Sequence, residues 1–147
     1  MFVILYRRML EVHDLKQIRP DGKPAFRTVL DYPTNTITWL NESIIIVADE
    51  RGNLIRLSGI GTKQVQLNLM ETKFKRLRQL KAFEGKFLAA IVHDEGEGKI
   101  VLWSTDSILE AKDLDRPKPA LVLKLNVGRL TSLNVQRASL KRKKSKA

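Results

Sequence analysis

The residues whose types could support catalysis or metal binding are His93, Asp94 and Glu95, three neighbours in the segment V-H-D-E-G-E-G-K. Imidazole and carboxylate groups are common metal ligands and general acids or bases. Adjacent residues of a strand point to opposite faces, so His93 and Asp94 converge only if a turn folds them together. The alternative is a polar turn in which Asp94 caps backbone donors. Because no third ligand or nucleophile is spaced near either histidine, we expect no enzymatic activity, no catalytic residue, no metal and no cofactor.

Positive charge points instead to polyanion binding. The chain has 147 residues and a formal net charge of +11, and such a surface favours partners such as nucleic acid. The last residues form a basic run that repels itself and is expected to stay disordered until it meets a polyanion. The block K-R-K-K favours nuclear or nucleolar import and rRNA contact, with a solubilising tail as the alternative. The cations assigned to this nucleic-acid or import tail are Arg137, Lys141, Arg142, Lys143, Lys144 and Lys146.

A second basic cluster surrounds Phe74 within nine residues. A positive groove with an aromatic side chain can hold single-stranded RNA by charge and stacking. The alternative is a solvated strand face or loop whose apolar members face the core. The candidate RNA contacts are Lys73, Lys75, Arg76, Arg78 and Lys81.

The overall composition is that of one globular unit, with 43% hydrophobic and 29% charged residues. The absence of cysteine excludes a disulfide framework, thiolate zinc sites and thiol catalysis. We expect no membrane span, because every apolar run falls well short of the roughly 20 residues that a bilayer requires. These features favour a binding or scaffold protein over an enzyme or a membrane protein.

The chemistry-bearing residues lie on a recurring hairpin. Residues 92–104 are the end of one strand, a glycine-bearing turn and a second strand that closes on Trp103. Residues 43–57 repeat this pattern, with Asp49 standing 94 − 49 = 45 positions before Asp94. An internal repeat of about 40–45 residues with short strands is typical of four-stranded propeller blades. Carried along the chain, this interval places the ends of the second strands at Val12, Leu57 and Leu102.

The repeat predicts an all-β fold, a partial propeller over residues 1–135, followed by a disordered basic tail at 136–147. Two full four-stranded blades are expected, with half a blade at each end. The predicted strands are 2–6 and 9–12 for the first half; 26–32, 36–40, 43–48 and 53–57 for one blade; 64–69, 76–83, 86–92 and 99–103 for the next; and 121–127 and 130–135 for the last half. Since propellers normally need 4–8 blades to close, we expect the chain to be the C-terminal part of a larger propeller, or a partner chain to supply the missing blades.

One stretch permits two interpretations. Met70, Phe74 and Leu77 are spaced like one face of a helix, whereas the repeat requires a strand that includes Leu77. We favour the strand. Trp39 and Trp103 are interpreted as core residues rather than ligand platforms, and the Trp103 indole N–H would need a buried acceptor.

The position after each repeated hairpin is where the terminal Trp-Asp dipeptide of a propeller blade belongs. One copy keeps the aspartate and another the tryptophan, so the repeats resemble degenerate WD repeats. The dipeptides at these positions are His13-Asp14, Ser58-Gly59 and Trp103-Ser104.

The chain also resembles the Pak-kinase-interacting WD-repeat proteins that act in assembly of the large ribosomal subunit. The resemblance rests on F-V-I-L-Y and M-L-E-V at 2–12, on I-T-W-L-N-E-S-I-I-I-V-A-D-E with L-I-R-L at 37–57, and on G-K-I-V-L-W followed by L-N-V-G-R-L-T-S-L-N-V and a lysine-rich end. It spans nearly the whole chain but only the C-terminal part of such a protein.

The resemblance implies a non-enzymatic scaffold for 60S biogenesis and rRNA processing in the nucleolus and nucleus. Blade rims would dock ribosome assembly factors on pre-60S particles, and the basic tail would hold pre-rRNA or an import receptor. Two alternatives remain open: a negative regulator that binds and inhibits a Pak-type kinase, which the same resemblance implies, and a charge-driven, non-specific RNA-binding protein.

Overall fold

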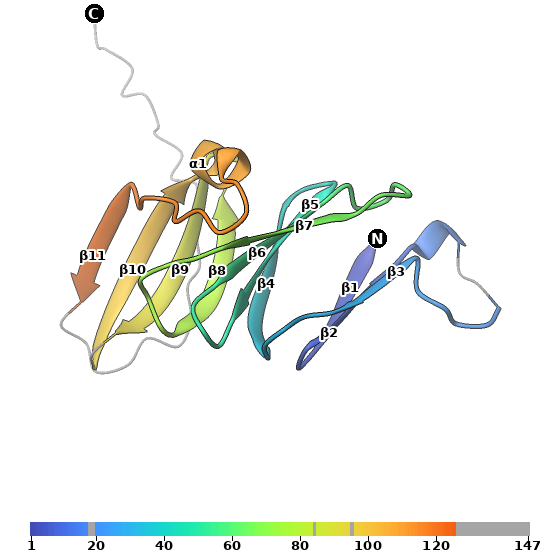
Figure 1. The fold of residues 1–147 in the computed structure, drawn as a ribbon, viewed down its shortest axis with the longest axis horizontal. Helices are drawn as coiled ribbons and strands as arrows, with labels where there is room; N and C mark the ends of the chain where they lie inside the picture. Colours follow the sequence, from blue (N-terminus) through green and yellow to red (C-terminus); the bar gives the residue numbers. More distant parts are fainter. Residues whose placement is uncertain (18–19, 84, 95, 126–147) are drawn as a thin grey trace, which may run out of the picture.

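The computed structural model is an all-β structure of three antiparallel sheets (Figure 1) and describes residues 1–17, 20–83, 85–94 and 96–125. The predicted strand at 130–135, the basic tail and Glu95 lie outside these residues. The described strands are β1 (Phe2–Tyr6), β2 (Met9–His13), β3 (Phe26–Val29), β4 (Thr34–Asn41), β5 (Ile44–Asp49), β6 (Leu54–Ser58), β7 (Gln66–Met70), β8 (Leu77–Phe83), β9 (Phe87–Asp94), β10 (Glu97–Ser104) and β11 (Leu121–Leu125). A 3-10 turn, η1 (Leu15–Gln17), and a short helix, α1 (Thr105–Glu110), are the helical elements of the described part.

The three sheets stack along the long axis of the molecule, with the second sheet (β4 to β7) between the first (β1 to β3) and the third (β8 to β11), as Figure 1 shows. Strand side chains alternate between faces, so the middle sheet can be covered on both sides. In β5, Ile45 and Val47 belong to the apolar cluster shared with the first sheet. Ile46 and Ala48 belong to the cluster shared with the third sheet. We call the face of each sheet that points toward the preceding sheet its backward face. In the first sheet the corresponding face is the one that points away from the second sheet.

The grouping of strands into blades was predicted wrongly by one strand. Strand β3 pairs with β2, β7 with β6, and β11 with β10, so each hairpin is extended by the strand that follows it. The prediction had assigned 26–32 and 64–69 to the next blade. A strand that follows a hairpin can bond to the free hairpin edge before the chain crosses to the next sheet. Two four-stranded sheets are therefore present as predicted, but the first sheet has three strands instead of half a blade.

The 45-residue interval does not superimpose the hairpins side chain for side chain. Two residues separate the paired residues Tyr6 and Met9, and two separate Asp94 and Glu97. In the second sheet the Asp49 N–H bonds the Asn53 carbonyl at 3.1 Å, which leaves three residues between them. One extra residue moves every later side chain to the other face.

This change of face is visible at the ends of the second strands. Leu57 lies in the cluster shared with the first sheet, on the backward face of its own sheet. On β10 it is Val101 and Trp103, rather than Leu102, that lie on the backward face, in the cluster shared with the second sheet. Leu57 and Leu102, which the interval made equivalent, therefore point to opposite faces of their sheets.

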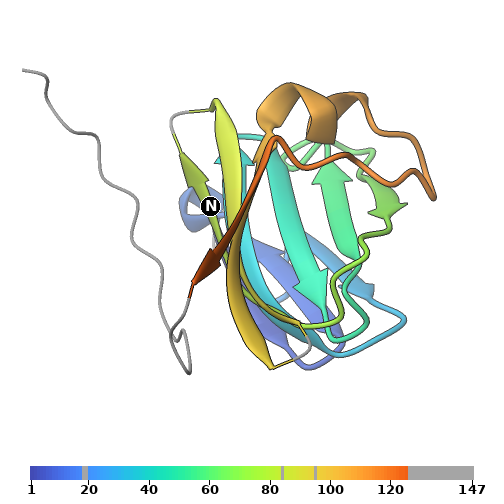
Figure 2. The same cartoon turned by 90° about the vertical axis from the view of Figure 1, so that its left-hand side faces the viewer.

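The ambiguous stretch before β8 is not helical. Strand β7 ends at Met70 and β8 begins at Leu77, which confirms the strand interpretation. Helix α1 was not predicted. Its N-cap is Ser104, whose hydroxyl accepts from the Ser107 N–H at 3.2 Å, and the helix lies at one end of the third sheet (Figure 2). In the described part of the chain, no helix has the length and apolarity needed to cross a membrane.

Candidate nucleic-acid interface

An open cavity of about 690 Å³ lies between the β5–β6 turn and the start of β8. Three arginines reach it from two segments, the β5–β6 turn and the start of β8, accompanied by one carboxylate and one amide. This cationic pocket, as we call it, is lined by Asn35, Glu50, Arg51, Arg76 and Arg78.

The β5–β6 turn that carries Arg51 is fixed by Asp49. The Asp49 Oδ1 atom accepts from the N–H groups of Arg51 at 2.8 Å and Asn53 at 3.0 Å, and its Oδ2 atom accepts from the Asn53 amide at 3.0 Å. Asp49 itself is 1% exposed. A short acidic side chain that bonds backbone donors ahead of it stabilises such a turn. The alternative interpretation of Asp94 was a polar turn of this kind.

Gly52 lets the segment before β8 pass directly against this turn. Its φ is +83°, and a Cβ atom at this position would lie 1.7 Å from the carbonyl oxygen of Phe74. The Thr72 hydroxyl donates to the Gly52 carbonyl at 2.6 Å. Only a residue without a side chain fits so close to a neighbouring backbone. This contact brings Arg51 and Arg76 to the same cavity.

A β-bulge presents Arg78 to the cavity. Leu77 and Gln79 pair with consecutive residues of β9, which leaves Arg78 as the extra residue of the bulge. The Asn35 amide donates to the Leu77 carbonyl at 3.2 Å and holds this part of β8 against β4. Farther along β4, the Thr36 hydroxyl accepts a hydrogen bond from the Leu80 N–H of β8 at 3.1 Å.

The pocket carries an excess of positive charge. Its three guanidinium groups face one carboxylate, that of Glu50, and all four side chains belong to exposed residues. None of the ion pairs between described residues uses Arg51, Arg76 or Arg78. Arg51 also lies over the Tyr32 ring, 4.7 Å from its centroid. Guanidinium groups with free donors are suited to phosphate oxygens, which they can bind in a bidentate manner.

The predicted basic cluster is divided by the structure. All five of its cations are exposed, but Arg76 and Arg78 join Arg51 at the cationic pocket while Lys73 lines a separate cavity of about 210 Å³ with Phe74 and Trp103. Lys75 and Lys81 are exposed outside both linings. The sequence interpretation did not include Arg51. Its only signal was the Asp-Glu-Arg-Gly-Asn turn, which does not reveal what packs against it.

Phe74 is unsuited to stacking on bases. The residue is 2% exposed, and its ring meets that of Trp103 edge to face at 6.3 Å. Lys73 lies over the Phe74 ring at 5.5 Å. Trp103 is fully buried and its indole N–H donates to the Pro117 carbonyl at 3.3 Å. Both aromatic residues therefore belong to the hydrophobic core. This agrees with the alternative interpretation of the basic cluster and with the interpretation of Trp103 as a core residue. Trp39 is partly buried against the hydrophobic cluster shared by the first and second sheets.

His93 and Asp94 belong to no metal-holding cluster of described residues, and Glu95 lies outside the described part of the chain. His93 and Asp94 are consecutive in β9, and the Asp94 carboxylate pairs with the Lys99 ammonium at 3.2 Å. No group of three histidine or acidic residues in the described part could hold a metal ion.

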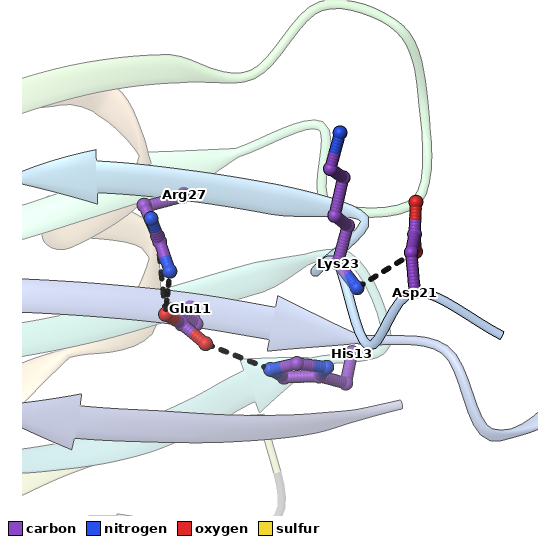
Figure 3. Close-up of polar contacts among 5 residues, drawn as sticks. All are labelled: Glu11, His13, Asp21, Lys23 and Arg27. Atoms are coloured by element: carbon purple, nitrogen blue, oxygen red, sulfur yellow. Dashed lines mark hydrogen bonds and ion pairs between the residues drawn. The ribbon is translucent and has the colours of Figure 1, made fainter. Parts of the chain in front are cut away.

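A buried carboxylate, missed at the sequence level, lies on the first sheet (Figure 3). Glu11 is 9% exposed and accepts from Arg27 through Nε at 3.0 Å and Nη2 at 2.5 Å. Its other oxygen lies 2.9 Å from His13 Nε2, and the His13 ring stacks on Phe2 with centroids 5.0 Å apart. The hydrogen bonds from Arg27 and then His13 hold the pKa of Glu11 below its usual value. This polar network joins neighbouring side chains of β2 and β3, which favours a structural role.

The degenerate Trp-Asp positions lie at the ends of equivalent strands but not on equivalent faces. His13 ends β2 on its backward face and Trp103 lies near the end of β10 on the backward face of the third sheet. Ser58 follows the backward-facing Leu57, so it points the other way. Asp14 and Gly59 follow in loops, and Ser104 is both the last residue of β10 and the N-cap of α1.

No known protein family and no curated protein matches the chain. The basic tail from Arg137 to Lys146 lies outside the described residues. The geometry of the cationic pocket is therefore the basis for the functional argument.

Proposed function

We propose that the protein is a non-enzymatic scaffold of the WD-repeat propeller type that acts in nucleolar assembly of the large ribosomal subunit and holds pre-rRNA. The observation that supports the RNA contact most directly is the cationic pocket. There, Arg51, Arg76 and Arg78 meet without an ion pair among the described residues. A phosphodiester would supply the missing negative charge.

The propeller interpretation is supported by the order of the sheets. Antiparallel sheets follow one another along the chain and pack face to face. Each pair of neighbouring sheets shares one hydrophobic cluster at its interface. Among the described residues, the three sheets are not closed into a ring. In a complete propeller, further blades from a longer chain or a partner would cover the outer faces, and their rims would dock assembly factors on pre-60S particles.

The test of the RNA contact is binding of a labelled single-stranded RNA, followed by fluorescence anisotropy at several salt concentrations. The triple variant Arg51→Gln, Arg76→Gln, Arg78→Gln should bind more weakly, and the slope of log K against log salt should flatten by about 2 for three lost phosphate contacts. The matched control removes three exposed lysines elsewhere, Lys16, Lys86 and Lys112. Equal loss in both triple variants would contradict a defined site.

Deletion of residues 136–147 separates the pocket from the tail. If that deletion abolishes binding while the pocket variant keeps full affinity, the protein is a charge-driven, non-specific RNA binder instead. The assembly role is tested by co-sedimentation with pre-60S particles after nuclease treatment. Inhibition of a purified Pak-type kinase, together with absence from these particles, would assign the regulatory function.

A further inference from the structure

We propose that the outer edge of β1 is a docking site for one extended strand of a partner protein. In the second sheet β5 lies between β4 and β6, and in the third β9 lies between β8 and β10. In the first sheet, β1 has β2 on one side and no strand on the other among the described residues. An unpaired edge presents N–H and C=O groups that can pair with another chain. This inference goes beyond the RNA contact and uses none of its residues.

The side chains of β1 have the composition of a contact surface. Phe2, Ile4 and Tyr6 are 40%, 43% and 61% exposed, whereas Val3 and Leu5 pack toward the second sheet. The same face of β5, counted back from its turn, carries Ile45 and Val47, which are fully buried. Exposed aromatic and aliphatic groups along an open strand edge favour addition of a strand that covers them.

Comparison with the other two sheets indicates that the site beside β1 is one strand wide, because, among the described strands, a single strand lies beyond β5 and a single strand beyond β9 on the corresponding side. Nothing in the described part of the chain pairs with β4 on the side away from β5, or with β8 on the side away from β9. Strand β4 runs antiparallel to β5, with Trp39 opposite Ile45 and Ile37 opposite Val47. An occupant in the same register would place bulky apolar side chains beside Phe2 and Ile4.

The other face of the occupant should carry hydroxyl groups. On β4 the alternate residues Thr36 and Thr38 accept from backbone N–H groups of β8, at 3.1 and 3.3 Å. A strand beside β1 would hold the same position relative to β4 that β4 holds relative to β8. The partner segment is therefore an extended stretch in which serine or threonine alternates with large apolar residues, antiparallel to β1.

The probe for this site is a synthetic peptide with the sequence of residues 33–42, P-T-N-T-I-T-W-L-N-E. Amide hydrogen exchange of the whole protein is followed by NMR while the peptide is added. At saturation, the amides of β1 that point away from β2 should exchange slower by a factor of about ten or more. A peptide with proline in place of isoleucine loses a donor and the strand geometry, and should protect nothing. Unchanged exchange in β1, or equal protection by the proline peptide, would overturn the proposal.

Two variants on the same exposed face separate edge binding from adhesion to the face. Ile4→Lys alters the open edge, and Val29→Lys alters β3 at the opposite edge, where the side chain is 63% exposed. Ile4→Lys should weaken peptide binding several-fold and Val29→Lys should leave it unchanged, with RNA affinity equal in both. Equal weakening in the two variants would show that the peptide lies across the face, which contradicts docking at β1.

Discussion

The first and second sheets contain similar hairpins but differ in what their backward faces carry. In the second sheet this face is a row of aliphatic side chains buried against the first sheet. In the first sheet it is a polar network flanked by exposed apolar groups. Counted from the turns and across the strand pairs, Ile55, Leu57 and Leu69 of the second sheet correspond to Glu11, His13 and Arg27 of the first.

This difference shows that the same arrangement of strands can support either a buried aliphatic interface or a solvent-exposed face that carries polar groups. Burial of aliphatic side chains contributes roughly 1.5–3 kcal/mol each, whereas exposed ion pairs contribute about 0–1 kcal/mol. The second and third sheets should therefore hold most of the stability. The first sheet keeps a surface that can still acquire a partner. Four predictions test this contrast.

The largest effect is expected for Trp103→Ala in the interface between the second and third sheets. The fully buried ring fills space beside Phe74, so its loss should lower the free energy of unfolding by about 3–5 kcal/mol. Tyr6→Ala, on the exposed face of β1, should change it by no more than about 0.5 kcal/mol. Urea denaturation measures both. A large loss from Tyr6→Ala would mean that the face is covered in solution.

Gly52→Ala should have the next largest effect, because the new methyl group would meet the Phe74 carbonyl at 1.7 Å. The control is Gly22→Ala in the first sheet's loop, where φ is +68° and nothing lies within 4 Å of the new atom. The control should lose about 1–2 kcal/mol from its left-handed backbone alone. Gly52→Ala should lose more, and should also lower RNA affinity by separating Arg51 from Arg76. Equal losses of stability in the two variants would argue against a tight contact at Gly52.

A smaller effect is expected for Thr36→Val, which keeps the side-chain shape but removes the acceptor for the Leu80 N–H. An unsatisfied donor costs about 1–3 kcal/mol. Thr28→Val in the first sheet is the matched change, since the described residues give its hydroxyl no hydrogen bond, and it should cost no more than about 0.5 kcal/mol. Thermal unfolding of the pair measures the difference, and similar melting temperatures would count against a role for the hydroxyl at the edge of β8.

The smallest effect is the pH dependence carried by Glu11. Because Arg27 and His13 hold the folded-state pKa of this carboxyl below its usual value, the unfolded chain binds more protons in acid. The contribution is complete above the unfolded pKa of about 4.3 and is lost as the pH falls through the lower folded value. Glu11→Gln should remove this part of the dependence. Urea titrations of both proteins between about pH 6 and pH 3 make the comparison, and parallel curves would exclude the effect.

Local strand positions could be predicted from the sequence because alternation and turn residues are local signals. The hairpins end at His13, Ser58 and Ser104, within one or two residues of the positions that the repeat gave. The assignment of strands to sheets could not be predicted, because β3, β7 and β11 could equally bond to the strand before or after them. The extra turn residue near Asp49 is equally invisible to a fixed interval, although it reverses the direction of Leu57.

The candidate site was predictable only in part. Arg76 and Arg78 stand out as charges in the sequence, but their convergence with Arg51 depends on a backbone contact at Gly52 across some twenty residues. The burial of Phe74 likewise depends on Trp103, which is distant in the sequence. Such long-range packing has no local sequence signature.

The burial of β5 limits how this sequence can diverge. All residues from Ile45 to Asp49 are buried, because the strand lies in the middle sheet with neighbours on both faces. A strand with one wet face accepts polar replacements at every second position, but β5 offers no such position. In a randomised library selected for folding, residues 45–49 should retain a narrow set of amino acids at consecutive sites, while the alternate positions of β1 drift freely.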